Sequence, residues 1–116
     1  MPQRDFAERT GDKWNGALVG SWSGVLLGDT FGALAIPLYA DKSVSVEGTL
    51  GAATITIQGS LDGTNYYTLN DPQGNALTFT SGTKRLEAIL ENVLFIRPAM
   101  SGADGTTNCS INILAR

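Results

Sequence analysis

An alternating stretch that ends in a tight turn constrains the fold of this chain more than any other feature. In Ala52–Asp71, AATITIQGSLDGTNYYTLND, Ile55 and Ile57 alternate with polar side chains. A two-residue period is that of a strand with one buried face. Asp62-Gly63 then supplies a dipeptide that accepts the backbone angles of a tight turn. The stretch therefore predicts two antiparallel strands joined by a hairpin, and it indicates structure without indicating chemistry.

Similar short runs recur along the chain, separated by Gly, Pro, Asp and Asn. The further runs are 17–27, 31–39, 43–50, 76–80, 93–100 and 110–114. Seven to nine short strands at this spacing, in a chain with 14 glycines and only 16% charged residues, predict an all-β fold. We expect a single-domain β-sandwich that is jelly-roll-like.

Three of these runs carry finer predictions. The glycines within 17–27 predict a bent or bulged strand, because glycine inside a strand often marks a bulge. Pro37 cannot donate a ladder hydrogen bond, so the run 31–39 is expected to be an edge strand or to end at Ile36. The run 93–100, VLFIRPAM, is apolar on both faces and predicts a central strand covered on both sides.

Two features stay open at the level of sequence. The segment 84–91, KRLEAILE, has the residue types and the apolar spacing of a helix, yet it is short for one, so helix and strand are both retained. Arg97 lies inside an apolar run. It is either a structural arginine paired with a carboxylate such as Glu91 or a residue that reaches a partner, and the structural role is favoured.

Residues 1–16 differ from the remaining chain, 17–116, which we take as the sandwich domain. Charged side chains crowd into this segment, and Phe6 and Trp14 are its only large apolar residues. One interpretation is a frayed terminus. The other is an extended N-terminal arm that docks on a neighbouring subunit, because aromatic anchors are favoured at interfaces. The candidate partner-binding residues of the chain are Arg4, Phe6, Arg9, Trp14 and Trp22.

The composition excludes several kinds of chemistry. The chain has no His and a single Cys, Cys109, which removes Ser-His and Cys-His nucleophile pairs and His-based metal sites. Cys109 is expected to be a buried free thiol. The aspartates lie one to a turn, where their side chains bond the local backbone, and nothing marks a glycosidase-style acid pair among them. We therefore expect no enzyme activity, no metal and no cofactor.

Charge and hydropathy exclude two kinds of partner. The formal charge is −3, so the chain lacks the basic footprint of a nucleic-acid-binding protein. No apolar run approaches the length that spans a bilayer, and the polar segment Met1–Asp5 is not followed by the apolar region of a secretion signal. We expect a protein that is made in a cytoplasm and has no membrane partner.

The chain also resembles a known family. The residues that carry the likeness are Trp22-Ser23-Gly24, Asp41-Lys42-Ser43-Val44, the run from Thr54 to Phe79, Phe95-Ile96-Arg97-Pro98 and the terminal strand. From about Ala17 onward they resemble the small decoration or cement proteins of tailed bacteriophages, which sit outside an HK97-type shell. The likeness consists of strand and turn patterning and includes no catalytic signature.

The resemblance implies a virion protein on the outer capsid surface that staples adjacent capsomers and stabilises the head. Its partners would be the major capsid protein and further copies of itself, as a dimer or trimer, and its terminus would reach over a neighbouring subunit. The run ITIQGSLDGTNYYTL is also similar to a discoidin-type carbohydrate-binding module, although that module usually carries a disulfide that this chain cannot form. Tail or fibre-associated virion proteins share the same β-rich composition.

Overall fold

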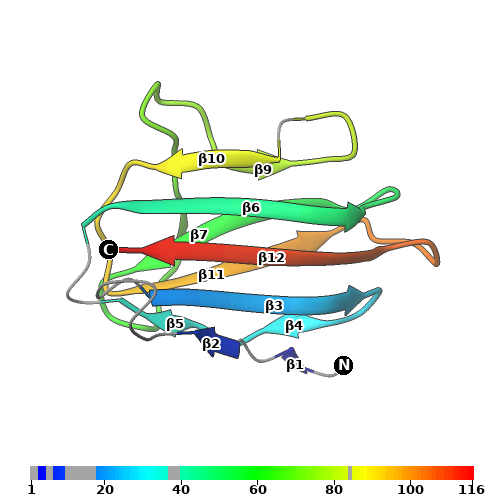
Figure 1. The fold of residues 1–116 in the computed structure, drawn as a ribbon, viewed down its shortest axis with the longest axis horizontal. Coiled ribbons are helices and arrows are strands. Elements are labelled where there is room, and N and C mark those ends of the chain that lie inside the picture. The colour runs from blue at the N-terminus through cyan, green and yellow to red at the C-terminus, as the bar shows by residue number, and fades with distance from the viewer. Residues whose placement is uncertain (1–2, 5–6, 10–17, 37–39, 84) are drawn as a thin grey trace.

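The computed structural model describes residues 3–4, 7–9, 18–36, 40–83 and 85–116, with side chains described from residue 18 onward. Within this part of the chain there is no helix, and two antiparallel sheets pack face to face (Figure 1). The strands are β1 (Gln3–Arg4), β2 (Ala7–Arg9), β3 (Leu18–Leu26), β4 (Thr30–Phe31), β5 (Leu34–Ala35), β6 (Lys42–Thr49), β7 (Thr54–Ser60), β8 (Tyr67–Thr68), β9 (Thr78–Phe79), β10 (Leu86–Ile89), β11 (Phe95–Ser101) and β12 (Asn108–Ala115).

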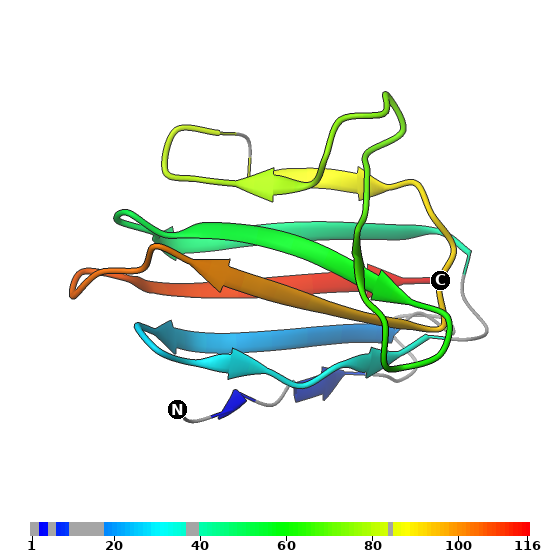
Figure 2. The ribbon, with the colours of Figure 1, turned by 180° about the vertical axis from the view of Figure 1, so that it is seen from behind.

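The strand order confirms the prediction of a jelly-roll-like β-sandwich. The first sheet has the order β10-β6-β12-β3-β2, and the second has the order β5-β11-β7-β8 with β9 also paired to β7. The eight strands β3, β5, β6, β7, β8, β10, β11 and β12 pair first with last, second with seventh, third with sixth and fourth with fifth. This nested pairing is that of a double-sheet jelly roll, and the view from behind shows the second sheet in front (Figure 2).

The core lies between the sheets and follows the predicted alternation. Ile55 and Ile57 of β7, Val44 and Val46 of β6, and Ile111 of β12 all point inward and have no exposed surface. Leu77, Phe79, Ile113 and Cys109 are also buried as predicted. Because each strand turns one face to this core, the polar partners of the alternation lie on the two outer faces.

The predicted bulge lies in β3. Cys109 of β12 pairs with Val25 and Ile111 pairs with Trp22, so β3 contains one more residue than β12 between these pairs. The extra residue falls at Ser23-Gly24, and Gly24 has a φ of +63°, an angle that glycine adopts without strain. The bulge bends the strand that pairs with the C-terminal strand.

Within the segment 84–91, the residues Leu86–Ile89 form a strand. Leu86–Ile89 form β10 and pair with Lys42–Ser45 of β6, so Ile89 points into the core while Leu86 points outward. The sequence left helix and strand open, and the free edge of β6 decides between them because it offers a full ladder of hydrogen bonds. Local helix propensity is too weak to compete with that pairing.

The strand β11 departs from its prediction. It lies between β5 and β7 and is central in its sheet, but only its inner residues, Ile96 and Pro98, are buried. Phe95, Arg97 and Ala99 lie half-buried on the outer face, so the prediction of a strand covered on both sides is wrong. A sandwich has two layers, and no third layer among the described elements covers this face.

The described part of the segment 1–16 pairs with the sandwich itself. Its strand β2 lies antiparallel to β3, with Ala7 opposite Ser21, and its strand β1 lies parallel to β4. The β5 strand ends at Ala35 at the edge of the second sheet, as predicted, and Pro37 lies outside the described residues.

Candidate functional site

The structure places two of the five predicted partner-binding residues by their backbone. Arg4 is the last residue of β1, and Arg9 is the last residue of β2, where it pairs with Val19. Phe6 and Trp14 lie outside the described residues. The structure therefore brings the two arginine positions alongside β3 and β4 at one edge of the sandwich.

Trp22 occupies the core, and its prediction as a partner-binding residue is corrected. Its side chain has 0% exposed surface, and its indole N–H donates to the carbonyl oxygen of Gly32 at 3.2 Å. A side chain without exposed surface offers no area to a partner of the folded chain. Tryptophan is large enough to fill the space between the sheets at this position, and its one polar atom is satisfied.

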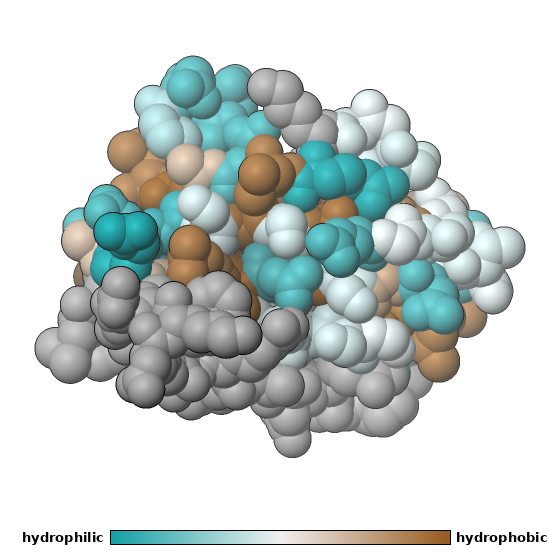
Figure 3. All heavy atoms as spheres, viewed as in Figure 1, coloured by the Kyte–Doolittle hydropathy of each residue, from teal (hydrophilic) through white to brown (hydrophobic). Residues whose placement is uncertain are grey.

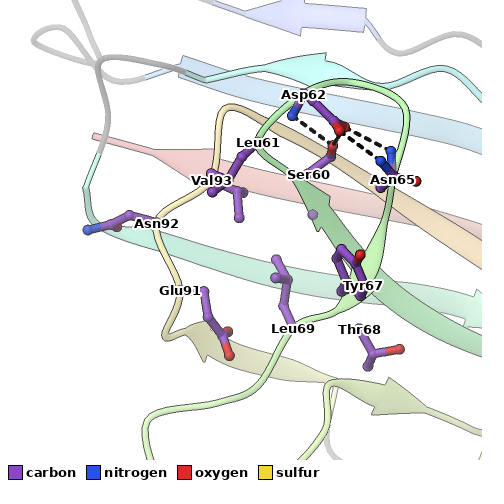
Figure 4. A pocket seen from close by; sticks show the side chains of 11 residues that line it. Ser60, Leu61, Asp62, Asn65, Tyr67, Thr68, Leu69, Glu91, Asn92 and Val93 are labelled. Carbon is purple, nitrogen blue, oxygen red and sulfur yellow. Dashed lines mark hydrogen bonds between the residues drawn. The ribbon is translucent and has the colours of Figure 1, made fainter.

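A hollow that can receive a ligand side chain lies at the end of the sandwich where β7 ends and β11 begins. Its volume is about 390 Å³. Three segments line it: the end of β7 with its turn, the strand β8, and the connection between β10 and β11 (Figure 4). The lining residues are Gly59, Ser60, Leu61, Asp62, Asn65, Tyr67, Thr68, Leu69, Glu91, Asn92 and Val93.

Asp62 organises the turn at one side of the hollow. Its Oδ1 accepts hydrogen bonds from the backbone N–H groups of Thr64 and Asn65, both at 2.8 Å, and from the Ser60 hydroxyl at 2.9 Å. Its Oδ2 accepts from the Asn65 side-chain amide at 2.8 Å. The backbone hydrogen bonds of Asn65 and Thr64, with the side-chain bonds, hold the pKa of Asp62 well below its usual range. The carboxylate is therefore fixed in place and ionised.

Glu91 occupies the opposite side and fastens a second loop. Its two carboxylate oxygens accept from the backbone N–H of Asn70 at 2.8 Å and from the Asn70 side-chain amide at 2.7 Å. Burial acts to raise the pKa of Glu91, but the two Asn70 hydrogen bonds and the charge of Lys42 outweigh it, so the pKa lies below its ordinary value. This second carboxylate is also ionised at neutral pH.

Lys42 supports the connection between β10 and β11 and is not among the residues that line the hollow. It is only 4% exposed, and its ammonium donates to the Asn92 side-chain oxygen at 2.8 Å and to the Ala40 carbonyl oxygen at 2.9 Å. Burial lowers the pKa of Lys42, and the charges of Asp41 and Glu91 oppose that shift. The ammonium thus holds the loop that carries Glu91 without lining the hollow.

The remaining wall of the hollow is apolar and partly exposed. Leu61 is 68% exposed and Tyr67 is 71% exposed, while Leu69 is buried. Gly59 forms the floor: a Cβ there would come within 3 Å of the side chains of both Val93 and Leu69, so only glycine allows these two side chains to close over the strand. Figure 4 shows the apolar side chains between Asp62 and Glu91.

Arg97 lies on the outer face of the second sheet, away from this hollow. Its guanidinium carbon is 3.7 Å from the centre of the Tyr66 ring, and its Nε donates to the Gln58 side-chain oxygen at 3.2 Å. Glu91, which the sequence suggested as its partner, bonds Asn70 instead. Arg97 is thus held by a cation–π contact and by a hydrogen bond to a neutral amide. These contacts support the structural role that the sequence favoured.

Among the described residues, no group of three or more His, Cys, Asp or Glu side chains is placed to hold a metal ion. Every described buried side-chain N or O atom has a hydrogen-bond partner. Burial raises the pKa of the Cys109 thiol, which is therefore protonated at neutral pH. No described helix has the length and apolar character to cross a membrane.

No sequence pattern indicated that the residues of the hollow come together. Glu91 and Asp62 are 29 positions apart in the chain, and only the pairing of β7 with β11 brings their loops to the same end of the sandwich. The dipeptide Tyr66-Tyr67 gave a partial signal. In a predicted strand, successive side chains point to opposite faces, so the two aromatic rings are expected on different faces.

Comparison of the chain with protein families, with curated proteins and with solved structures finds no match.

Proposed function

We propose that this chain is a structural virion protein, a capsid decoration or cement subunit that binds the outer surface of an HK97-type phage shell and stabilises the head. It acts by binding, without catalysis. Its partners are the major capsid protein and further copies of itself, as a dimer or trimer. The likeness of its strand and turn patterning to such proteins supports this function, and so does its compact jelly-roll fold.

One observation carries the proposal. The buried polar groups of the described chain are satisfied internally, whereas a set of large apolar side chains is left at the surface. These are Leu26, Leu27, Leu61, Tyr67, Leu86, Leu90 and Leu94. The described surface therefore offers apolar side chains to a partner, which suits a protein that functions by adhesion.

These side chains come from several parts of the fold: Leu26 lies at the end of β3, Leu61 and Tyr67 line the hollow, and Leu86 lies on β10. On the face that the first sheet presents, hydrophobic and hydrophilic residues are interspersed (Figure 3). Many small contacts become a stable attachment when symmetry repeats them, because each bound copy raises the effective concentration of the next contact. This favours a subunit that is present in many copies.

Purified heads that lack the protein test the proposal. We expect the added chain to co-sediment with these heads and to raise their resistance to heat and osmotic shock. An unrelated β-sandwich protein of similar size is the control. Heads that never bind the chain, and that are equally robust without it, would contradict the proposal.

The N-terminal segment is tested with two variants that separate backbone from side chains. Deletion of residues 1–16 removes β2 from the edge of β3, whereas Phe6→Ala with Trp14→Ala keeps the backbone that pairs there. If the segment is an arm on a neighbouring subunit, both variants bind heads more weakly while the sandwich stays folded. Unchanged binding by both variants would show that the segment is a terminus without a contact role.

A carbohydrate-binding module is the second function that we keep. The observation that favours it is the hollow, where the exposed ring of Tyr67 lies beside Asn65 and Thr68, because sugar rings stack on aromatic rings and hydrogen-bond amides and hydroxyls. Saturable binding on a glycan array that Tyr67→Ala abolishes would support it, and an array without signal would count against it.

A further inference from the structure

We propose that the hollow lined by Leu61, Asp62, Tyr67, Glu91 and Val93 is a socket for an arginine side chain of a protein partner. The partner class, a protein of the shell, rests on the proposed function. The chemistry of the socket does not rest on it.

The electrostatics of the hollow favour a cation. Its only acidic lining residues, Asp62 and Glu91, both have pKa values below their ordinary values, so both carry a negative charge at neutral pH. None of the lining residues is Lys or Arg. Lys42 contacts Asn92 from outside the hollow and is nearly buried, so it offsets part of the charge of Glu91 and leaves that of Asp62 untouched.

The shape and the apolar lining select arginine among the cations. The long stem of arginine packs against apolar surface while its charged end reaches polar groups, and Leu61 and Val93 provide such surface. The guanidinium is planar and stacks on aromatic rings, and the ring of Tyr67 is 71% exposed. A small metal ion would use neither the apolar wall nor the ring.

Glu91 keeps capacity for a further hydrogen bond, and Asp62 contributes its charge. An ionised carboxylate offers about four acceptor positions. Glu91 uses two of them for Asn70, whereas Asp62 already accepts four bonds, from the Ser60 hydroxyl, the Thr64 and Asn65 backbone N–H groups and the Asn65 amide. Since these existing bonds hold the carboxylates at opposite sides of the hollow, an incoming guanidinium meets two fixed negative charges that need no reordering (Figure 4).

A neutral glycan matches the hollow less well. A sugar would stack on Tyr67 and bond the amides, but it would leave two ionised carboxylates facing uncharged hydroxyls. The cation uses the ring, the apolar wall and the charges together.

The direct test is an NMR titration of the isotope-labelled full chain with N-acetyl-L-arginine amide. We expect saturable shifts of the Asn65, Tyr67 and Val93 backbone signals, with a Kd on the order of 1 mM. N-acetyl-L-citrulline amide has the same shape without the charge and should bind at least about tenfold more weakly. Equal binding of the two probes, or no shifts at these residues, would overturn the inference.

Variants locate the binding. Asp62→Asn keeps an oxygen that can accept from Thr64 and Asn65 while removing the charge, and Tyr67→Ala removes the ring. Each should weaken the binding of arginine amide by about tenfold. The controls are Glu47→Gln, which removes one negative charge outside the hollow, and Leu86→Ala, which trims an exposed side chain on β10; both should bind normally. Thermal unfolding verifies that each variant is folded.

Binding to heads separates this inference from the proposed function. If the unaltered chain binds heads and the Asp62→Asn/Tyr67→Ala variant binds equally well, the socket is not used and the inference fails while the function stands. If the unaltered chain does not bind heads, the proposed function fails, and the arginine titration alone decides the socket. A glycan signal that depends on Tyr67, without any response to arginine amide, would assign the hollow to carbohydrate instead.

Discussion

Two Asp-Gly turns in this protein use the same dipeptide in different ways. Asp62-Gly63 closes on itself: every hydrogen bond of its carboxylate comes from within three residues. Gly63 takes a φ of +79°, and a Cβ there would touch only the Phe95 ring, at 3.4 Å. The turn is a local structure that its own six residues, 60–65, explain.

Asp104-Gly105 holds another loop as well as its own. Its carboxylate accepts from the backbone N–H and hydroxyl of Thr106, at 2.8 and 2.6 Å, and also from the backbone N–H of Ala52 at 3.0 Å. The neighbouring Thr107 hydroxyl donates to the Leu50 carbonyl oxygen at 2.9 Å in a buried position. Two loops 52 residues apart in the chain are joined at this point.

The difference shows that a turn motif specifies a local reversal and leaves its energetic importance to its surroundings. Asp62 supports a turn beside a hollow, where the residue is exposed and ionised. Asp104 and Thr107 instead join the loop between β6 and β7 to the loop between β11 and β12. The first arrangement suits a contact site, and the second suits the integrity of the sandwich.

Gly51→Ala should have the largest effect on this comparison. Gly51 has a φ of +60°, and a Cβ there would lie 2.5 Å from both the Asp104 carboxylate and the Thr106 hydroxyl. Backbone strain and the displaced carboxylate should together lower the free energy of unfolding by roughly 3 kcal/mol. Urea denaturation measures the change. Gly82→Ala, which has open space and no positive φ, is the control and should be close to neutral.

Thr107→Val comes next. It removes a buried hydroxyl that donates to Leu50 and accepts from the Asp104 backbone N–H, so both of those groups lose a partner. The expected loss is about 2 kcal/mol of unfolding free energy. Thr106→Val removes an exposed hydroxyl and should cost less than half as much in the same denaturation experiment. Equal losses would mean that the buried Thr107 hydroxyl contributes no more to stability than the exposed Thr106 hydroxyl.

Gly63→Ala should have a smaller effect. The positive φ strains an alanine, but the nearest atom belongs to the edge of the Phe95 ring, at an ordinary contact distance. A loss of about 1 kcal/mol follows from the backbone alone. If Gly63→Ala proved as costly as Gly51→Ala, the local turn would matter to the sandwich as much as the junction does.

Acid pH is expected to change the stability least, and here Asp62 should contribute more than Asp104. Hydrogen bonds from Asn65 and Thr64 lower the pKa of Asp62, and hydrogen bonds from Thr106 and then Ala52 lower that of Asp104 less strongly. A carboxyl whose folded pKa is depressed contributes stability above its unfolded pKa of about 3.9 and loses it as the pH falls toward the folded pKa.

Asp62→Asn and Asp104→Asn should therefore each flatten the decline of Tm below about pH 4, and Asp62→Asn should flatten it more. Thermal unfolding from pH 7 to pH 2 measures this decline. An equal or greater flattening in Asp104→Asn would show that the local turn does not hold its carboxylate the more tightly.

Much of the fold could be predicted because strand periodicity is a local property. The alternation around Ile55 and Ile111 identified the buried face of each strand, and the glycines before Val25 indicated the bulge. The predictions failed or stayed open where the outcome depended on distant residues. Trp22 has no local signal that distinguishes a core position from an exposed anchor, and Leu86–Ile89 within segment 84–91 became a strand because the edge of β6 was free to pair.

The candidate site was beyond sequence reasoning for the same reason. Leu61 and Tyr67 come from one hairpin and Glu91 from a connection that follows later in the chain, and no pattern within either segment refers to the other. Asp62 was assigned correctly to a turn, but its place on the wall of a hollow depends on how β11 pairs with β7.

The amino-acid sequence by itself determined that the chain is all-β, where its turns lie and which strand residues point inward, because side-chain alternation and turn chemistry act over a few neighbouring residues. The tertiary structure alone decided the nested order of the strands, the burial of Trp22, the partner of Arg97 and the hollow between Asp62 and Glu91. These depend on pairing between segments tens of residues apart, and such pairing is selected by the packing of the whole core.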